Sequence, residues 1–153
     1  KTNKWLKIKI KEDNYKGFIK QKKFKKFTKA THKIDKLKAP FYLKNKKKGY
    51  LAFGSKIKVD KKVGNYFSFG KHKIKASYLK SIKFKQKDYF SKIKIFRGVK
   101  YKWGGKSFKG IDCSALIQVC LNFNNKYCPR DAKDQVKYFK KNIKLKNIKK
   151  NNN

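Results

Sequence analysis

Apolar and polar residues alternate along the first half of the chain. In residues 4–11, Leu6, Ile8 and Ile10 fall on one side of an extended backbone and lysines fall on the other. A period of two is the pattern of a half-buried strand. Similar short runs follow, most of them separated by turn residues: 15–19, 31–34, 39–43, 50–54, 56–60, 65–69 and 72–76. Closely spaced short strands predict a small open β-barrel that Ser77–Leu79 would close, over about residues 1–85.

Two local predictions inside this region depend on a few residues. Pro40 lacks a backbone N–H, which confines it to an edge strand or to the start of a strand. The segment from Asn45 to Gly49 has turn-forming residues at both ends, so we expect a turn there.

The spacing of apolar residues changes near Lys87. Residues 88–96 place apolar side chains at helical spacing, although part of the run also alternates, and we predict a helix that ends before Gly98. The apolar residues of 115–123 also recur at helical spacing, and two asparagines follow them. This segment is therefore predicted to be a helix.

A third helix is expected from about Ala132, with Val136 and Phe139 on its inner face. From residue 140 the chain is rich in Lys and Asn and ends in three Asn, a low-complexity tail that we expect to be frayed. We assign 86–153 to a second, mostly helical domain. Together with the strands, this gives an α+β fold class.

The chain carries a formal net charge of +39, which is normally a sign of an anionic partner. Only two of its 47 basic residues are Arg, namely Arg97 and Arg130. Bidentate recognition of phosphate or guanine favours Arg, and the lysines are spread over all predicted elements. We therefore expect no specific nucleic-acid partner. Drift toward AT-rich codons and a selected polyanion-binding surface both remain open as origins of the charge. No apolar run approaches the length of a membrane span.

The three cysteines are Cys113, Cys120 and Cys128. Their number is odd, no Cys-x-x-Cys occurs, and the first two are separated by two turns of one helix, too far for an unstrained disulfide. This pattern favours neither a disulfide framework nor a four-ligand zinc site. We expect no metal and no cofactor.

Cys113 falls where the 115–123 helix should begin, with Asp112 as its expected N-cap. Unpaired N–H groups and the helix dipole favour a thiolate at such a position, and the thiolate is the nucleophilic form. Gly104, Gly105 and Gly110 would let a substrate approach the backbone, and a backbone N–H could stabilise an oxyanion. A small buried cysteine at a helix start is an equally acceptable interpretation of these residues.

Two segments carry a resemblance to a known family. The segment 101–118 reads Y-K-W-G-G-K-S-F-K-G-I-D-C-S-A-L-I-Q, and 128–135 reads C-P-R-D-A-K-D-Q. Their order and spacing closely resemble the NlpC/P60 family of cell-wall cysteine peptidases. More weakly, G-F-I, T-H-K-I, L-A-F-G-S-K-I-K-V and S-Y-L upstream resemble the bacterial SH3-like domains that precede this peptidase domain in many members.

The resemblance implies an SH3-like barrel followed by the N-terminal, mostly helical part of a papain-like peptidase domain. It implies hydrolysis of peptidoglycan stem peptides, usually between D-γ-glutamate and diaminopimelate or lysine, in the cell envelope. Cys113 would be the nucleophile and Tyr101 would assist near the thiolate or oxyanion. Asp112 and Ser114 would line the substrate pocket, with Asp112 near the free amine of the substrate. Arg130 would lie at the pocket edge or brace the loop. Two further matched positions are expected to serve packing: Trp103 and Gln118.

Two departures from the family pattern stand out. Ala115 replaces a usual Gly, which a helix tolerates. The family's general base is a His tens of residues after the cysteine, whereas the chain's two histidines, His32 and His72, both precede it. We expect the chain as given to be inactive. It would be either an N-terminal fragment of a peptidase or a non-catalytic wall-binding module with a decayed peptidase remnant. No signal peptide is apparent, and the chain starts at Lys1 rather than Met.

Overall fold

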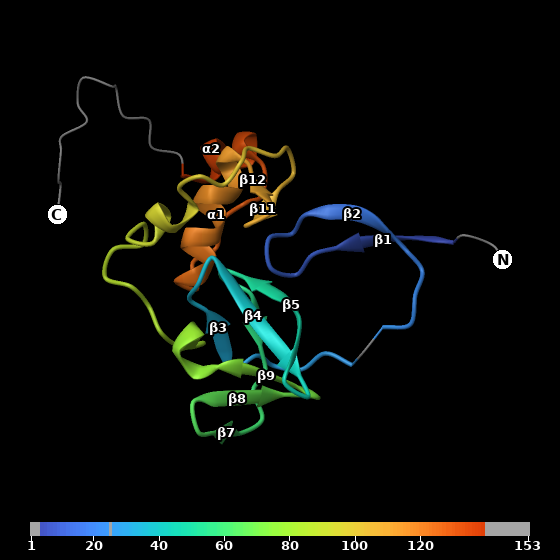
Figure 1. Cartoon of the computed structure of the whole chain (residues 1–153). Helices are drawn as coiled ribbons and strands as arrows, with labels where there is room; N and C mark the ends of the chain where they lie inside the picture. Colours follow the sequence, from blue (N-terminus) through green and yellow to red (C-terminus); the bar gives the residue numbers. More distant parts are fainter. Residues whose placement is uncertain (1–3, 25, 140–153) are drawn as a thin grey trace.

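The computed structural model describes residues 4–24 and 26–139 (Figure 1). Strands dominate up to residue 81, and both α-helices follow residue 112. The elements in chain order are β1 (Trp5–Lys9), β2 (Lys16–Lys20), β3 (His32–Ile34), β4 (Lys38–Leu43), β5 (Lys46–Ala52), β6 (Lys56–Ile57), β7 (Lys62–Val63), β8 (Tyr66–Phe69), β9 (His72–Lys75), η1 (Ala76–Tyr78), β10 (Leu79–Ser81), η2 (Ile93–Phe96), β11 (Lys106–Ser107), β12 (Gly110–Ile111), α1 (Cys113–Phe123) and α2 (Ala132–Phe139).

The strands before residue 82 form three antiparallel sheets. A five-stranded sheet has the order β5-β4-β9-β8-β7, a three-stranded sheet has the order β10-β3-β6, and β1 and β2 form a hairpin of their own (Figure 1). The mixed α and β content expected from the sequence is confirmed. The closed barrel is not: within the described residues, these sheets remain separate.

The turn predicted over 45–49 is wrong except at its start. Lys44 and Asn45 have positive φ values of 45° and 64°, so the chain reverses there, and β5 already begins at Lys46. Pro40 lies inside β4, opposite Tyr50 of β5. On the other side of β4, β9 pairs only with residues 41 and 42, so Pro40 does have an edge position on that side.

The helix predicted over 88–96 is wrong. Asp88 accepts the backbone N–H of Phe90 with its carboxylate, and successive turns follow, of which only η2 is helical. A carboxylate that bonds to nearby backbone competes with helix formation, and two β-branched isoleucines lower the helix propensity further. Phe96 is nevertheless buried, so the spacing identified a core position correctly.

The two later helices are confirmed, with one error of orientation. In α2 the buried residue is Gln135, whereas Val136 is 66% exposed and Phe139 is 46% exposed, so the predicted inner face is wrong. The predicted low-complexity tail from residue 140 lies outside the described residues. Among the described residues, neither α-helix has the length and apolar character that a membrane span needs.

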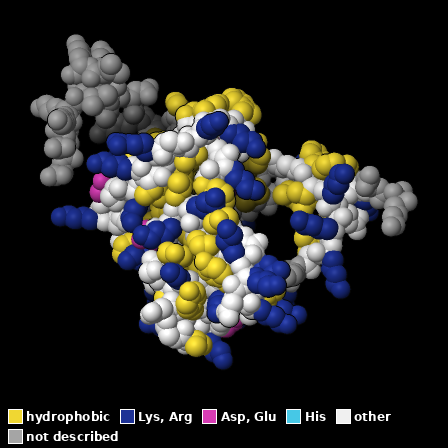
Figure 2. Space-filling model, in the orientation of Figure 1, with side chains coloured by type: hydrophobic (Ala, Val, Ile, Leu, Met, Phe, Trp, Pro, Cys, Tyr) yellow, Lys and Arg dark blue, Asp and Glu magenta, His cyan; other side chains and the backbone are white. Residues whose placement is uncertain are grey.

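The described residues form two apolar clusters. One lies between the sheets and consists of Ile34, Ala39, Ile74 and Leu79. The other surrounds α1, and the strand region contributes Phe53 to it. The Phe53 ring stacks on that of Phe123 with centroids 4.6 Å apart. This contact helps to join the sheets to the helix that begins with Cys113. Basic side chains are scattered over the visible face rather than gathered in one stripe (Figure 2).

Candidate active site

The start of α1 is fixed by the residue before it. Asp112 has an extended backbone, and its carboxylate accepts the N–H of Ala115 at 2.8 Å, as an N-cap does. Cys113 is therefore the first residue of α1, and it is exposed. Cys113 thus belongs to the first turn of the helix, where backbone N–H groups have no partner within the helix, as the sequence predicted.

The glycines before the cysteine allow the chain to approach itself closely. A Cβ at Gly105 would lie 2.5 Å from the carbonyl oxygen of Gly110, and a Cβ at Gly110 would lie 2.5 Å from Cβ of Lys102. Gly104 has a φ of 72° and donates its N–H to Asp112 at 2.9 Å. These residues pack the β11–β12 hairpin against the segment that precedes it, which fixes the position of Asp112.

The buried Asp112 forms a bidentate ion pair with Arg130, which is partly buried. The two guanidinium nitrogens donate to the two carboxylate oxygens at 3.0 and 2.6 Å. The Ser114 hydroxyl donates to Asp112 at 3.1 Å and accepts from Arg130 at 2.9 Å. Hydrogen bonding from Arg130 is the main reason that the pKa of Asp112 falls to about 2, and the same bond raises the pKa of Arg130. Asp112 is thus ionised at neutral pH, and the contacts of Arg130 include both residues that flank Cys113.

Two buried glutamines hold the neighbouring loop. Gln118 donates to the carboxylate of Asp13 at 3.1 Å and to the carbonyl of Cys128 at 3.0 Å. Gln135 donates to the carbonyls of Ser114 and Pro129 at 2.8 and 2.9 Å. The Cys-Pro-Arg segment is therefore held against α1 by Gln118, which bonds to Cys128, and by Gln135, which bonds to Pro129 and to Ser114 of α1. Gln118 is fully buried, in agreement with its expected packing role.

A cavity of about 650 Å³ lies at the N-terminus of α1. All five site residues predicted from the sequence line it, so the structure brings them together. Its lining residues are Ile10, Asp13, Tyr15, Tyr101, Trp103, Gly104, Lys106, Asp112, Cys113, Ser114, Arg130, Asp131, Ala132 and Lys133. Trp103 is 87% exposed, so the expectation that it serves packing is wrong.

Nothing in the sequence predicted that the N-terminal hairpin would reach this cavity. Ile10, Asp13 and Tyr15 come from the turn between β1 and β2, about 100 residues before the cysteine in the chain. The Tyr127 hydroxyl donates to the backbone carbonyl of Asp13 at 3.3 Å, and Gln118 holds its carboxylate. Asp13 lies in a Glu-Asp-Asn turn of the sequence. Because a turn residue is ordinarily solvated, its presence there did not predict a buried carboxylate at the cavity.

The other two cysteines have different surroundings. Cys120 and Cys128 are buried, and burial raises the pKa of Cys120 to about 11 and that of Cys128 above its usual value. A buried neutral thiol is a weak nucleophile. Cys113 is the exposed thiol of the three.

Neither histidine is among the residues that line the cavity of Cys113. His32 lies on β3 with its ring 4.8 Å from that of Phe67, and burial lowers its pKa. His72 lies on β9 against the rings of Phe41 and Phe69. Both side chains belong to the sheets. Within the described part of the chain, no three His, Cys, Asp or Glu side chains are grouped as metal ligands.

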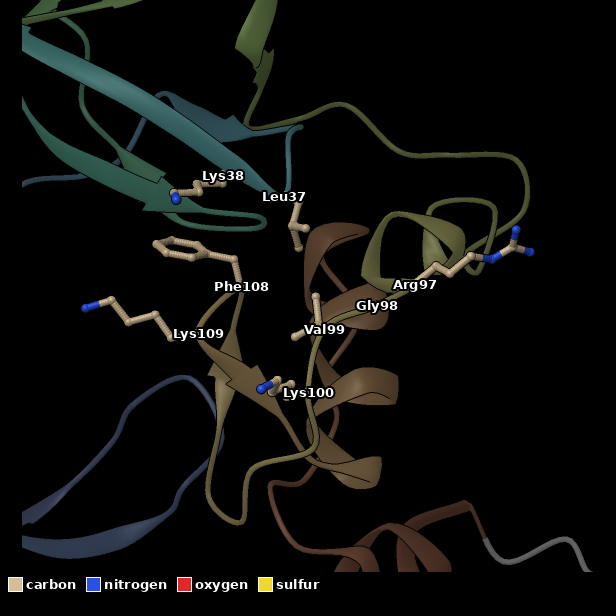
Figure 3. Close-up of a pocket in the computed structure, with 8 residues that line it drawn as sticks. All are labelled: Leu37, Lys38, Arg97, Gly98, Val99, Lys100, Phe108 and Lys109. Atoms are coloured by element: carbon tan, nitrogen blue, oxygen red, sulfur yellow. The ribbon is translucent and has the colours of Figure 1, made fainter.

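A second cavity of about 410 Å³ lies where the strand region meets the segment before β11 (Figure 3). Its lining is basic and contains no thiol: Leu37, Lys38, Arg97, Gly98, Val99, Lys100, Phe108 and Lys109. The side chains of Arg97 and Lys109 point away from the other residues (Figure 3). The ammonium of Lys38 lies 4.1 Å from the ring centroid of Tyr50. The basic groups of this cavity therefore do not converge on one point.

Comparisons with known proteins agree with the resemblance in the sequence. The model of the NlpC/P60 family matches residues 98–151. The fold is similar to the crystal structure of an NlpC/P60 family protein from Bacillus cereus ATCC 10987, with a TM-score of 0.78 and 15% identity. The match covers 97% of this chain and 58% of that one. No curated protein matches the chain. The resemblance to the NlpC/P60 family is thus confirmed for the segment that contains Cys113.

Proposed function

We propose that this chain supplies the nucleophile and the substrate pocket of a cysteine endopeptidase that cleaves peptidoglycan stem peptides. One observation carries the proposal: an exposed thiol at the first position of an N-capped helix opens onto a cavity of about 650 Å³. The match of residues 98–151 to the NlpC/P60 family supports it. The bond would be the one between D-γ-glutamate and diaminopimelate or lysine.

In this reaction the Cys113 thiolate adds to the carbonyl carbon of the glutamyl γ-amide. The C–N bond breaks as the departing amine takes up a proton, and water then hydrolyses the thioester. N–H groups at the start of α1 would stabilise the oxyanion, and the Tyr101 hydroxyl would assist beside it. Tyr101 is 65% exposed and lines the cavity, so its hydroxyl is accessible to a substrate.

Asp112, Ser114 and Arg130 would form the floor of the pocket. The ionised carboxylate of Asp112 would favour a substrate amine nearby, as the family resemblance implies. Because Arg130 is bonded to both Asp112 and Ser114, we assign it the role of bracing the loop rather than of contacting substrate at the pocket edge. Its planar donor fork suits this bidentate contact, which Lys cannot reproduce.

The proposal also covers how the chain divides into domains and where the catalytic general base, a His, is located. Residues 1–85 would form an SH3-like wall-binding unit, and 86–153 would form the first part of the peptidase domain, acting in the cell envelope. Because this chain covers 58% of the similar solved chain, we propose that the catalytic His belongs to a part of the protein outside these 153 residues.

The position of the histidines favours a second candidate, a non-catalytic module that binds the cell wall. His32 and His72 pack among aromatic rings of the sheets, and neither lines the cavity. If these were the protein's two histidines, neither could act as the general base for Cys113, and the chain would bind a peptide without cleaving it. The two candidates differ in whether Cys113 reacts with a substrate-like carbonyl.

A substrate-like electrophile separates the two candidates. L-Ala-D-Glu with a chloromethyl ketone in place of the γ-carboxylate should alkylate Cys113, detected by mass spectrometry of peptides. The L-Glu diastereomer should react at least about 10-fold more slowly, and Cys113→Ser should give no adduct. Equal rates for the two diastereomers would overturn the proposed peptidase. A wall-binding module without peptidase chemistry would still adhere to purified peptidoglycan.

A further inference from the structure

Lys106 is a partly buried cation in the cavity of Cys113. It is the first residue of β11, and it pairs with Ile111 of β12, which directly precedes Asp112. Directly opposed residues of antiparallel strands have Cα atoms about 5 Å apart, so Lys106 is close to the start of α1. Its side chain also lines a neighbouring cavity of about 290 Å³ and thus forms part of the wall between the two.

The acidic groups around Lys106 are engaged elsewhere. Glu12 is paired with Lys56 at 2.5 Å. Asp13 accepts from Gln118 at 3.1 Å and from the N–H of Tyr15 at 3.1 Å. Among the described residues, no carboxylate oxygen lies within 4.0 Å of the Lys106 ammonium, so its charge has no direct partner.

The surroundings of Lys106 disfavour its charge. Burial is the main cause that lowers its pKa, and the positive charges of Arg130 and Lys56 lower it further. Attraction to Glu12 and Asp13 acts in the opposite direction without outweighing burial. A bound anion would compensate such a charge and would gain more from it than from a solvated lysine.

The other cations of the cavity are less available to a ligand. Arg130 is committed to Asp112 and Ser114. Lys133 lies in the first turn of α2 and is exposed, where water screens its charge. Lys106 is therefore the partly buried cation that could bind an anion in this cavity.

We propose that Lys106 binds a carboxylate of the peptide in the cavity, namely the α-carboxylate of its γ-linked glutamate. A γ-linkage leaves that carboxylate free, a few bonds from the carbonyl that Cys113 would attack. The chain would thereby select stem peptides with a free glutamate over those in which this group is amidated. This inference rests on the proposed function and adds the substrate group that the pocket distinguishes.

Binding measurements with a matched pair of peptides test the inference. L-Ala-γ-D-Glu-L-Lys and its α-amide differ at one group, which is a carboxylate in the first and a neutral amide in the second. Calorimetry in a Cys113→Ala background excludes turnover. We expect the acid to bind at least about 10-fold more tightly than the amide, the range for a hydrogen bond to a charged group. Lys106→Gln should abolish this preference, Lys106→Arg should restore part of it, and Lys133→Gln should leave it intact.

Each outcome has one meaning. Equal affinity for acid and amide in the Cys113→Ala protein, unchanged by Lys106→Gln, would overturn the role of Lys106 and leave the peptidase proposal standing. Failure of both peptides to bind would overturn the proposed function itself. Thermal unfolding of each variant shows that a lost preference does not come from lost folding.

Discussion

The two halves of the molecule have different kinds of interior. Between the sheets, apolar side chains pack together, with Ile34, Ala39 and Ile74 all 0% exposed. Around the start and end of α1, polar side chains are buried and hydrogen-bonded to one another or to backbone: Asp112, Ser114, Gln118, Asn124 and Gln135. The first interior needs apolar residues at alternating positions, whereas the second needs particular partners.

This difference explains how so many lysines are tolerated. In β1 and β2 four of the six outward positions of the ladder are Lys, whereas Leu6, Ile8 and Ile19 lie at inward positions. An outward lysine on such a strand leaves the interior unchanged. Around α1, replacing one of these buried polar residues leaves its hydrogen-bond partner buried and unpaired. This lowers the free energy of unfolding far more than an outward lysine on a strand does. Predictions that compare the two regions follow, with the largest expected effect first.

Arg130→Met should give the largest loss of stability. The substitution leaves the buried carboxylate of Asp112 without its counter-ion, and breaking a buried pair in this way costs about 3–5 kcal/mol. Urea unfolding followed by circular dichroism measures the change. Arg97→Met removes an exposed Arg and should change the free energy of unfolding by less than about 0.5 kcal/mol. Similar values for both variants would show that the polar interior does not depend on its ion pair.

Ile74→Ala should destabilise the apolar interior by about 3 kcal/mol, since it removes methyl groups from a fully buried position and leaves a cavity. Val63→Ala at a 61% exposed position of the same sheet is the matched control and should be nearly neutral. Urea unfolding measures both variants. A loss below 1 kcal/mol for Ile74→Ala would mean that the sheets gain little from this cluster.

Acid should weaken the polar interior at a defined pH. The folded pKa of Asp112 is about 2, below its unfolded value of about 4, so its stabilisation is complete above pH 4 and is lost as the pH falls toward 2. The loss should be about 1–2 kcal/mol. Urea unfolding at pH 5 and at pH 2.5 should show it in the wild type and not in Asp112→Asn. Asp60→Asn, at an exposed turn, should retain the full loss.

The sequence predicted the two interiors unequally. Alternation located β1, β8 and β9, because a half-buried strand repeats every two residues. The motif placed Asp112 and Cys113 at the start of α1, since N-capping is a local interaction. It could not predict that the tip of the β1–β2 hairpin lines the cavity, because that contact joins residues about 100 positions apart. Nor could it show that the strands form separate sheets instead of a barrel, which depends on pairing between distant strands.

Lys33 is the exception that joins the two interiors. It lies on β3 and is 0% exposed, and its ammonium donates to the backbone carbonyls of Phe84 and Phe123. The carbonyl of Phe123 is at the C-terminus of α1, where cations are favourable, and the ammonium lies 4.5 Å from the centroid of its ring. A strand residue therefore caps the helix whose other end carries Cys113.

The titration of Lys33 gives a predicted effect at alkaline pH. Its pKa is lowered to about 8, mainly by burial, with Lys56 and Lys85 lowering it and Asp35 raising it. Between pH 8 and pH 10.5 the unfolded state binds the extra proton, so this lysine makes the folded state more stable as the pH rises. We expect the difference in free energy of unfolding between wild type and Lys33→Met to shift in favour of the wild type over that range. The exposed lysines titrate in both proteins and cancel in the difference. A constant difference would mean that the capping bonds to the two carbonyls hold Lys33 charged, and that the two interiors are joined by an ion rather than by a titratable amine.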